Sequence, residues 1–71
     1  MNRKEIGNKL VELRGGRPQY QVAADLGISQ NALSMYERGE RIPRDEIKLK
    51  LAQYYKTSVQ EIFFMQNVHK L

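Results

Sequence analysis

Apolar residues recur along this chain at intervals of three and four, the spacing that places side chains on one face of an α-helix. Five such series follow one another: Ile6, Leu10 and Leu13; Val22, Ala23 and Leu26; Leu33 and Tyr36, with Ala32 beside them; Ile47, Leu51, Tyr54 and Tyr55; and Val59, Ile62 and Phe63. No segment alternates between apolar and polar residues as a strand does. The pattern predicts an all-α fold, a compact five-helix domain over residues 1–65 followed by a C-terminal tail at 66–71.

Residues that favour helix starts precede four of the five series. Asn2 and Ser29 are suitable N-caps, and Ser58 opens a Ser-Val-Gln-Glu stretch that is typical of a capping box. The first helix is broken by Gly-Gly-Arg-Pro at 15–18, and we expect Pro18 in the first turn of the second helix. Four of the five helices therefore have a start signal in the sequence.

Glycines mark two of the helix ends. Gly27 and Gly39 stand where a helix end needs a left-handed residue. The third helix should therefore end near Arg38, and the fourth should run from about Asp45 to Tyr55.

The second and third helices, with the turn between them, have the form of a helix-turn-helix over 19–38. Ala23 is small enough for close contact with the third helix, and Gly27 permits a tight turn. Ile28 directs the turn into the core, and Leu33 with Tyr36 anchors the following helix. This pattern predicts a DNA-binding unit.

The outward positions of the third helix carry the candidate chemistry. They are Gln30, Asn31, Ser34 and Met35, with no charge among them, although 28% of the chain is charged. Amide side chains can pair with adenine N6 and N7 in the major groove, and methionine can contact thymine methyl groups. We expect these four residues to read bases.

Charge supports the same interpretation. Lys and Arg number 12 against 8 Asp and Glu, a formal charge of +4, which favours an acidic partner. Candidate phosphate contacts flank the unit at Arg17, Arg38, Arg41 and Arg44. Cysteine is absent and His69 is the single histidine, so we expect no metal site, no cofactor and no enzyme activity. No apolar run is long enough for a membrane span, and a soluble cytoplasmic protein is expected.

The chain resembles the Xre/Cro type of helix-turn-helix, the DNA-binding domain of phage repressors and many small bacterial regulators. The resemblance covers Ile6-Gly7-Asn8-Lys9-Leu10, Val22-Ala23-Ala24-Asp25-Leu26-Gly27-Ile28-Ser29, Tyr36-Glu37-Arg38-Gly39, Arg41-Ile42-Pro43, Leu51-Ala52 and Ser58-Val59-Gln60-Glu61-Ile62-Phe63. It implies that Gln19 binds a phosphate, as do Arg41 and Arg44. It also implies an ion pair between Arg14 and Glu37, and dimers formed through the last two helices.

Some positions depart from the family pattern. The link from Arg14 to Gln19 is about two residues shorter than usual, by comparison of the two patterns. Pro18 replaces the usual Ser or Thr cap, and Lys56 replaces a frequent Gly. Asp45 and Lys48 stand where many members have core leucines.

Leu49 falls outside the apolar arc of the fourth helix, and Phe64 lies beyond that of the fifth. A domain this small cannot bury every apolar group, so we expect Leu49 and Phe64 in a homodimer interface. The sequence thus predicts a double-stranded-DNA-binding transcription regulator, a small repressor that binds a palindromic operator as a dimer. The alternative is an antitoxin or adaptor module whose main partner is another protein. Non-specific DNA compaction is disfavoured because the charge is modest and the reading face is neutral.

Overall fold

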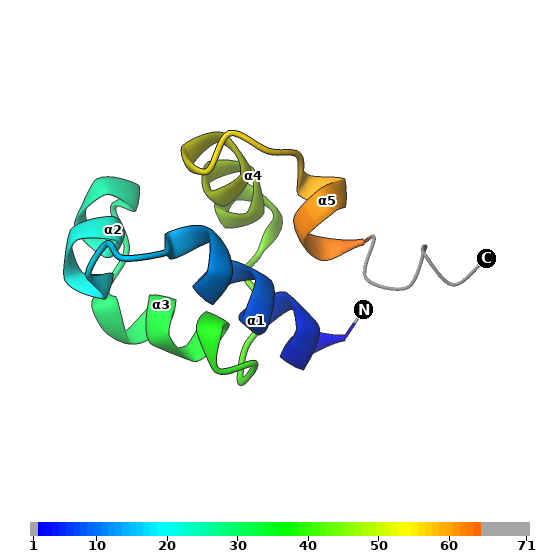
Figure 1. Cartoon of the computed structure of the whole chain (residues 1–71), viewed down its shortest axis with the longest axis horizontal. Helices are drawn as coiled ribbons and strands as arrows, with labels where there is room; N and C mark the ends of the chain where they lie inside the picture. The colour runs from blue at the N-terminus through cyan, green and yellow to red at the C-terminus, as the bar shows by residue number, and fades with distance from the viewer. Residues whose placement is uncertain (1, 65–71) are drawn as a thin grey trace.

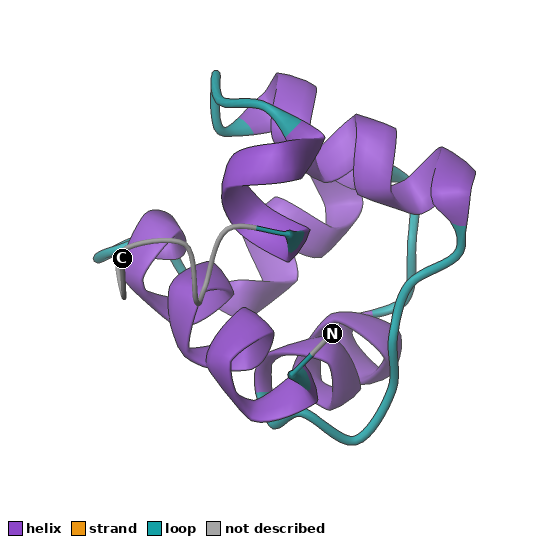
Figure 2. Cartoon of the chain, turned by 90° about the vertical axis from the view of Figure 1, so that its right-hand side faces the viewer, coloured by secondary structure: helices purple, strands orange, loops and turns teal. Residues whose placement is uncertain are grey.

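The computed structural model describes residues 2–64, which form five α-helices joined by short loops (Figure 1). The helices are α1 (Arg3–Arg14), α2 (Gln19–Leu26), α3 (Gln30–Glu37), α4 (Asp45–Tyr54) and α5 (Val59–Phe63). Figure 2 shows helices and loops, with no strand in this part of the chain. The all-α, five-helix fold expected from the apolar pattern is confirmed. The expected tail at 66–71, with His69, lies outside the described residues.

All five helices contribute to one core. Its buried apolar members are Ile6, Leu10, Val22, Ala23, Leu26, Leu33, Tyr36, Ile47, Leu51, Ala52, Ile62 and Phe63. Leu13, Ile28, Tyr54, Tyr55 and Val59 are partly buried and pack against this core. The periodicity of the sequence therefore identified the inward face of every helix, with Ala52 as an added member.

Helix α1 joins the two halves of the domain. It contacts α3 on one side and α5 on the other, while α2 packs on α3 and α4 (Figure 1). A Cβ atom added to the buried Gly7 would fall on the carbonyl of Glu37, and one on Gly39 would lie 3.0 Å from the carbonyl oxygen of Arg3. The two glycines let α1 cross closely over the end of α3 and so hold α3 in place.

Side-chain caps begin three of the helices, as predicted. Asn2 Oδ1 accepts from the backbone N–H of Glu5, and Ser29 Oγ accepts from that of Ala32, each at 3.0 Å. Ser58 Oγ accepts from the N–H of Glu61, also at 3.0 Å. These bonds satisfy N–H groups that have no partner within their own helix.

Two details of the helix starts differ from expectation. Pro18 is the N-cap of α2 and does not lie in its first turn: its ψ of 148° is extended, while its carbonyl accepts from Gln21 and Val22. The capping box at Ser58 is formed on one side only. The carboxylate of Glu61 accepts from Thr57 Oγ1 at 3.1 Å, so it is engaged one residue before the cap.

Candidate nucleic-acid interface

The turn from α2 to α3 sets the direction of α3. Gly27 adopts a left-handed φ of 72°, and its N–H and that of Ile28 bond to the carbonyls of Ala24 and Ala23. These two backbone hydrogen bonds close the end of α2 tightly. Ser29 then caps α3, so the reading helix begins immediately after the turn.

The four predicted base-reading residues lie on two successive turns of α3. Gln30 and Asn31 are exposed in the first turn, and Ser34 and Met35 are partly buried in the next. Asn31 Nδ2 lies 3.7 Å from Met35 Sδ, which links the two turns along one side of the helix. The structure brings all four onto one face, and no charged residue lies between them in the sequence.

A chain of polar contacts connects this face to α1. Arg14 donates from Nε to Glu37 Oε2 at 2.7 Å and from Nη2 to Oε1 at 3.1 Å. Gln19 Nε2 donates to the same Glu37 Oε1 at 2.8 Å, and Gln30 Nε2 lies 3.5 Å from Gln19 Oε1. The contacts therefore run from α1 through α3 and α2 to a predicted base-reading amide.

The Arg14–Glu37 pair is largely out of solvent, with side-chain exposures of 18% and 3%. The bond to Glu37 raises the pKa of Arg14 above its ordinary value, against the opposing effect of burial. Arg14 Nη1 also donates to the carbonyl of Arg17 at 2.7 Å. A buried carboxylate with this many donors is a geometric constraint on α1, α2 and α3 more than a net source of stability, because desolvation offsets the attraction.

The arginines predicted to bind phosphate occupy different environments. Arg17 lies in the loop between α1 and α2, with its guanidinium carbon 5.1 Å from the ring centre of Tyr54 and 5.5 Å from that of Tyr55. Arg38 is bound to Glu40 and to Ser34. Arg41 and Arg44 are exposed in the loop before α4, and within residues 2–64 neither forms an ion pair. Arg41 and Arg44 can therefore bind an external anion without first breaking an ion pair within the described residues.

An apolar patch lies over α4 and α5. Leu49 is 55% exposed and Phe64 is 52% exposed, and with Val59 they line a shallow hollow. Lys48 and Asp45 complete its lining, with Lys48 Nζ 5.5 Å from the Phe64 ring centre and 3.6 Å from Asp45 Oδ1. The sequence had singled out Leu49 and Phe64, and both are indeed left outside the core.

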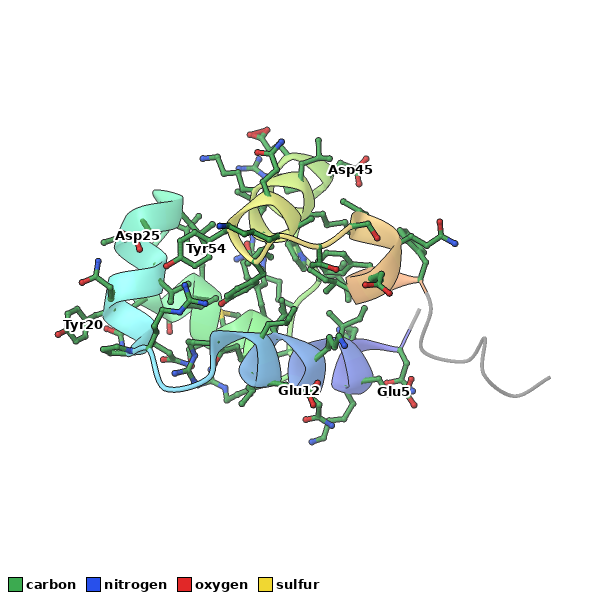
Figure 3. All side chains as sticks on the ribbon, turned by 45° about the horizontal axis from the view of Figure 1, so that its top comes forward. Glu5, Glu12, Tyr20, Asp25, Asp45 and Tyr54 are labelled. Carbon is green, nitrogen blue, oxygen red and sulfur yellow. The ribbon has the colours of Figure 1, made fainter. Side chains whose placement is uncertain are left out.

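Some contacts were not anticipated from the sequence. Tyr54 donates to Asp25 Oδ2 at 2.7 Å, and the two side chains lie together between α2 and α4 (Figure 3). Tyr20, in the first turn of α2, points away from the molecule and is 64% exposed (Figure 3). Glu40, which holds Arg38, was also missed. The sequence Arg38-Gly39-Glu40 could have indicated this pair, because a glycine that reverses the chain lies between two opposite charges.

Within residues 2–64, no group of three or more His, Cys, Asp or Glu side chains is placed to hold a metal ion. No helix in that range is long and apolar enough to cross a membrane.

Comparison with known proteins gives one result. The family model described as helix-turn-helix matches residues 9–62, most of the chain. Neither the curated proteins nor the solved structures yield a significant match.

Proposed function

We propose, from the premise that the chain belongs to the Xre/Cro-type helix-turn-helix family of DNA-binding transcription regulators, that it is a small bacterial or phage repressor acting in the cytoplasm. In this proposal it binds a palindromic operator as a homodimer. The observation that carries the proposal is the uncharged, outward face of α3. It combines exposed amides with adjoining arginines at the end of a capped, tightly held helix.

In this proposal Gln30, Asn31, Ser34 and Met35 enter the major groove and read base edges. An exposed helix surface in a chain this rich in charge would ordinarily carry Lys and Glu there. The neutral polar face instead suits hydrogen bonding to bases, whose edges carry no net charge.

Arg41 and Arg44 supply the phosphate contacts most directly, because their side chains are exposed and unpaired with the described acidic groups. Gln19 and Arg17 reach a phosphate only by giving up part of their contacts with Glu37 and the two tyrosines. Such contacts give affinity and register without sequence choice.

The apolar patch of α4 and α5 supports dimerisation. A two-fold contact repeats one patch on both subunits, so Leu49 and Phe64 of each copy would cover those of the other. Two α3 helices would then face successive major grooves, which requires a palindromic site.

The antitoxin or adaptor alternative relies on the same region. Exposure of the whole run 62–64 would favour it, but Ile62 and Phe63 are fully buried and only Phe64 is exposed. Two of the three residues whose exposure would favour this alternative are therefore part of the core, and the repressor is favoured.

Selection of bound sequences from a random double-stranded DNA pool tests this function. We expect one enriched motif with two-fold symmetry and half-sites centred about one helical turn apart. Enrichment of no motif, with binding that depends on salt alone, would overturn the proposal.

A further inference from the structure

Ser34 lies in the middle of the proposed reading face, and its hydroxyl already has a partner within the protein. Arg38, one turn later on α3, donates from Nη1 to Ser34 Oγ at 2.6 Å. Residues four apart lie on the same side of a helix, and long side chains point back towards its N-terminus. Arg38 therefore reaches Ser34 without leaving the surface of α3.

The guanidinium of Arg38 is held from its other side by Glu40. Nε lies 3.1 Å from Glu40 Oε2, and Nη2 lies 3.0 Å from Oε1, so two parallel hydrogen bonds join the guanidinium to the carboxylate. Gly39 makes it feasible: its φ of 75° reverses the chain, and the N–H of Glu40 bonds to the carbonyl of Met35. The paired geometry leaves Nη1 directed at Ser34.

We call these contacts from Glu40 through Arg38 to Ser34 the relay. The relay determines the direction of the hydrogen bond between Arg38 and Ser34. A hydroxyl has one hydrogen and two lone pairs, while a guanidinium donates only. Ser34 must therefore accept from Arg38. Among the described residues no acceptor is found for its own hydrogen, which remains for an outside group. The bond to Arg38 also holds the pKa of Glu40 below its ordinary value, so both charges of the pair are present at neutral pH.

We propose that Arg38 and Glu40 are positioning residues that make Ser34 a hydrogen-bond donor towards the DNA. The inference rests on the proposed function and names one feature of its operator. A serine free to rotate can either donate or accept and so reads bases poorly. The positive guanidinium beside Ser34 disfavours a second donor at the remaining lone pair and leaves the hydroxyl hydrogen to be donated outwards. Ser34 therefore favours guanine or thymine, whose O6 and O4 accept, and disfavours cytosine, whose major-groove group is the N4 donor.

Arg38 then acts through Ser34, and this role differs measurably from that of a phosphate contact. Loss of a phosphate contact weakens all sequences alike and makes the logarithmic salt slope shallower by about 0.9. Loss of the relay changes the preference at one base pair and leaves the salt slope as it was.

The experiment selects operators with the parent protein and with Ser34→Ala, which locates the base pair facing Ser34. Binding to the four variants of that pair is then measured for the parent, Arg38→Ala and Glu40→Gln. We expect the parent to bind cytosine there about three- to tenfold more weakly than guanine or thymine, the range of one hydrogen bond. Arg38→Ala and Glu40→Gln should both lose most of that difference, because the hydroxyl is no longer held against the positive guanidinium and can rotate to accept from N4.

Arg41→Ala is the matched control, an exposed arginine without an ion pair in residues 2–64. Arg41→Ala should make the logarithmic salt slope shallower by about 0.9 and should still bind cytosine more weakly at the pair that faces Ser34. Melting temperatures confirm that the variants fold, since an exposed pair adds little stability.

The inference is overturned if Arg38→Ala makes the salt slope shallower as Arg41→Ala does. It is also overturned if Arg38→Ala and Glu40→Gln still bind the cytosine operator as weakly, relative to the others, as the parent does. Failure of the parent to select any motif overturns the proposed function instead, so the two failures are distinguishable.

Discussion

Gly7 and Gly39 show how much of this domain depends on the absence of two side chains. Both lie where α1 crosses the C-terminal end of α3, and backbone atoms of each helix fill the space that a Cβ would need. Gly39 also requires its left-handed φ, whereas Gly7 lies within a regular helix, where glycine is intrinsically unfavourable. Close packing is therefore the reason that Gly7 fits its position.

Gly7→Ala tests this at residue scale. Alanine improves helix propensity by about 1 kcal/mol, but the collision with the Glu37 carbonyl requires a backbone shift. We expect a net loss of about 1–3 kcal/mol in the free energy of unfolding, measured by urea denaturation. Gly16→Ala is the control, because no atom lies within 4 Å of its added Cβ. Equal stability of Gly7→Ala and the parent would mean that the crossing is looser than described.

Tyr55 has a buried hydroxyl for which the described residues offer no hydrogen-bond partner. Burial raises its pKa to about 12, with the charge of Glu37 as a second cause. An unfolded tyrosine ionises near pH 10. The unfolded state therefore loses its proton first, and stability falls as the pH rises from about 10 to 12.

Tyr55→Phe should remove this contribution to the loss of stability at alkaline pH. After allowance for solvent screening of a partly exposed ring, we expect the parent to lose about 1–2 kcal/mol more than the variant between pH 10 and 12. At neutral pH the variant should match or slightly exceed the parent, because it removes an unpaired polar group. Denaturation curves at pH 7, 10 and 12 measure this. Parallel losses in both proteins would show that Tyr55 does not titrate in this way.

At the scale of elements, three of the helices end in the same way and one of them uses an unexpected residue. α2, α3 and α4 each end in a left-handed residue followed by a backbone bond back to the helix. Gly27 and Gly39 serve the first two, whereas Lys56 serves α4 with a φ of 57°. A side chain in that conformation costs about 1–2 kcal/mol.

Lys56→Gly should therefore stabilise the protein. The relief of strain exceeds the added entropy of the unfolded glycine, for a net gain of about 0.5–1 kcal/mol. In a domain of this size the melting temperature should rise by a few degrees, at about 4–8 °C per kcal/mol. Gly27→Ala is the converse experiment and should lower it. A lower melting temperature for Lys56→Gly would show that the lysine side chain has a compensating contact.

The reading helix carries the prediction on DNA binding. Gln30→Ala and Asn31→Ala should each cost about 1–3 kcal/mol at the selected operator and change base preference, because each removes an exposed amide from the proposed groove face. Quantitative gel-shift titrations measure this, with Gln60→Ala on the exposed face of α5 as the control. Operator binding like that of the parent would place base recognition elsewhere.

For the whole molecule, the arrangement separates the α3 face from the apolar patch. α3 and α5 lie on different sides of α1, so each surface can engage a partner while the other is occupied (Figure 1). Lys48 shows how the patch tolerates a charge: its side chain is 11% exposed, with the ammonium 5.6 Å from the Phe63 ring centre. Lys48 thus occupies the position of a core leucine common in the family by burying the aliphatic part of its side chain.

Leu49→Lys combined with Phe64→Lys should convert the proposed dimer into a monomer, because two added charges per subunit would face each other across the two-fold axis. Sedimentation equilibrium measures this, and the doubly substituted protein should also lose affinity for a palindromic site more than for one half-site. Val11→Lys, at an exposed apolar residue of α1, is the control. A parent protein that remains monomeric at high concentration and occupies a single half-site would exclude the dimer.

The sequence by itself determined the elements, the side-chain caps of α1, α3 and α5, and the buried faces, because helix periodicity and capping are local properties of a few neighbouring residues. It also placed Leu49 outside the apolar arc of α4 and identified Lys56 as a departure where glycine is usual. Whether Gly7 was needed could not be known from one helix alone, since that depends on a carbonyl of α3 thirty residues later in the chain. The same holds for Arg17 over the rings of Tyr54 and Tyr55, and for the contact that joins Glu37 to Gln19. These are contacts between residues far apart in sequence, and only the packing of the helices decides which side chains meet.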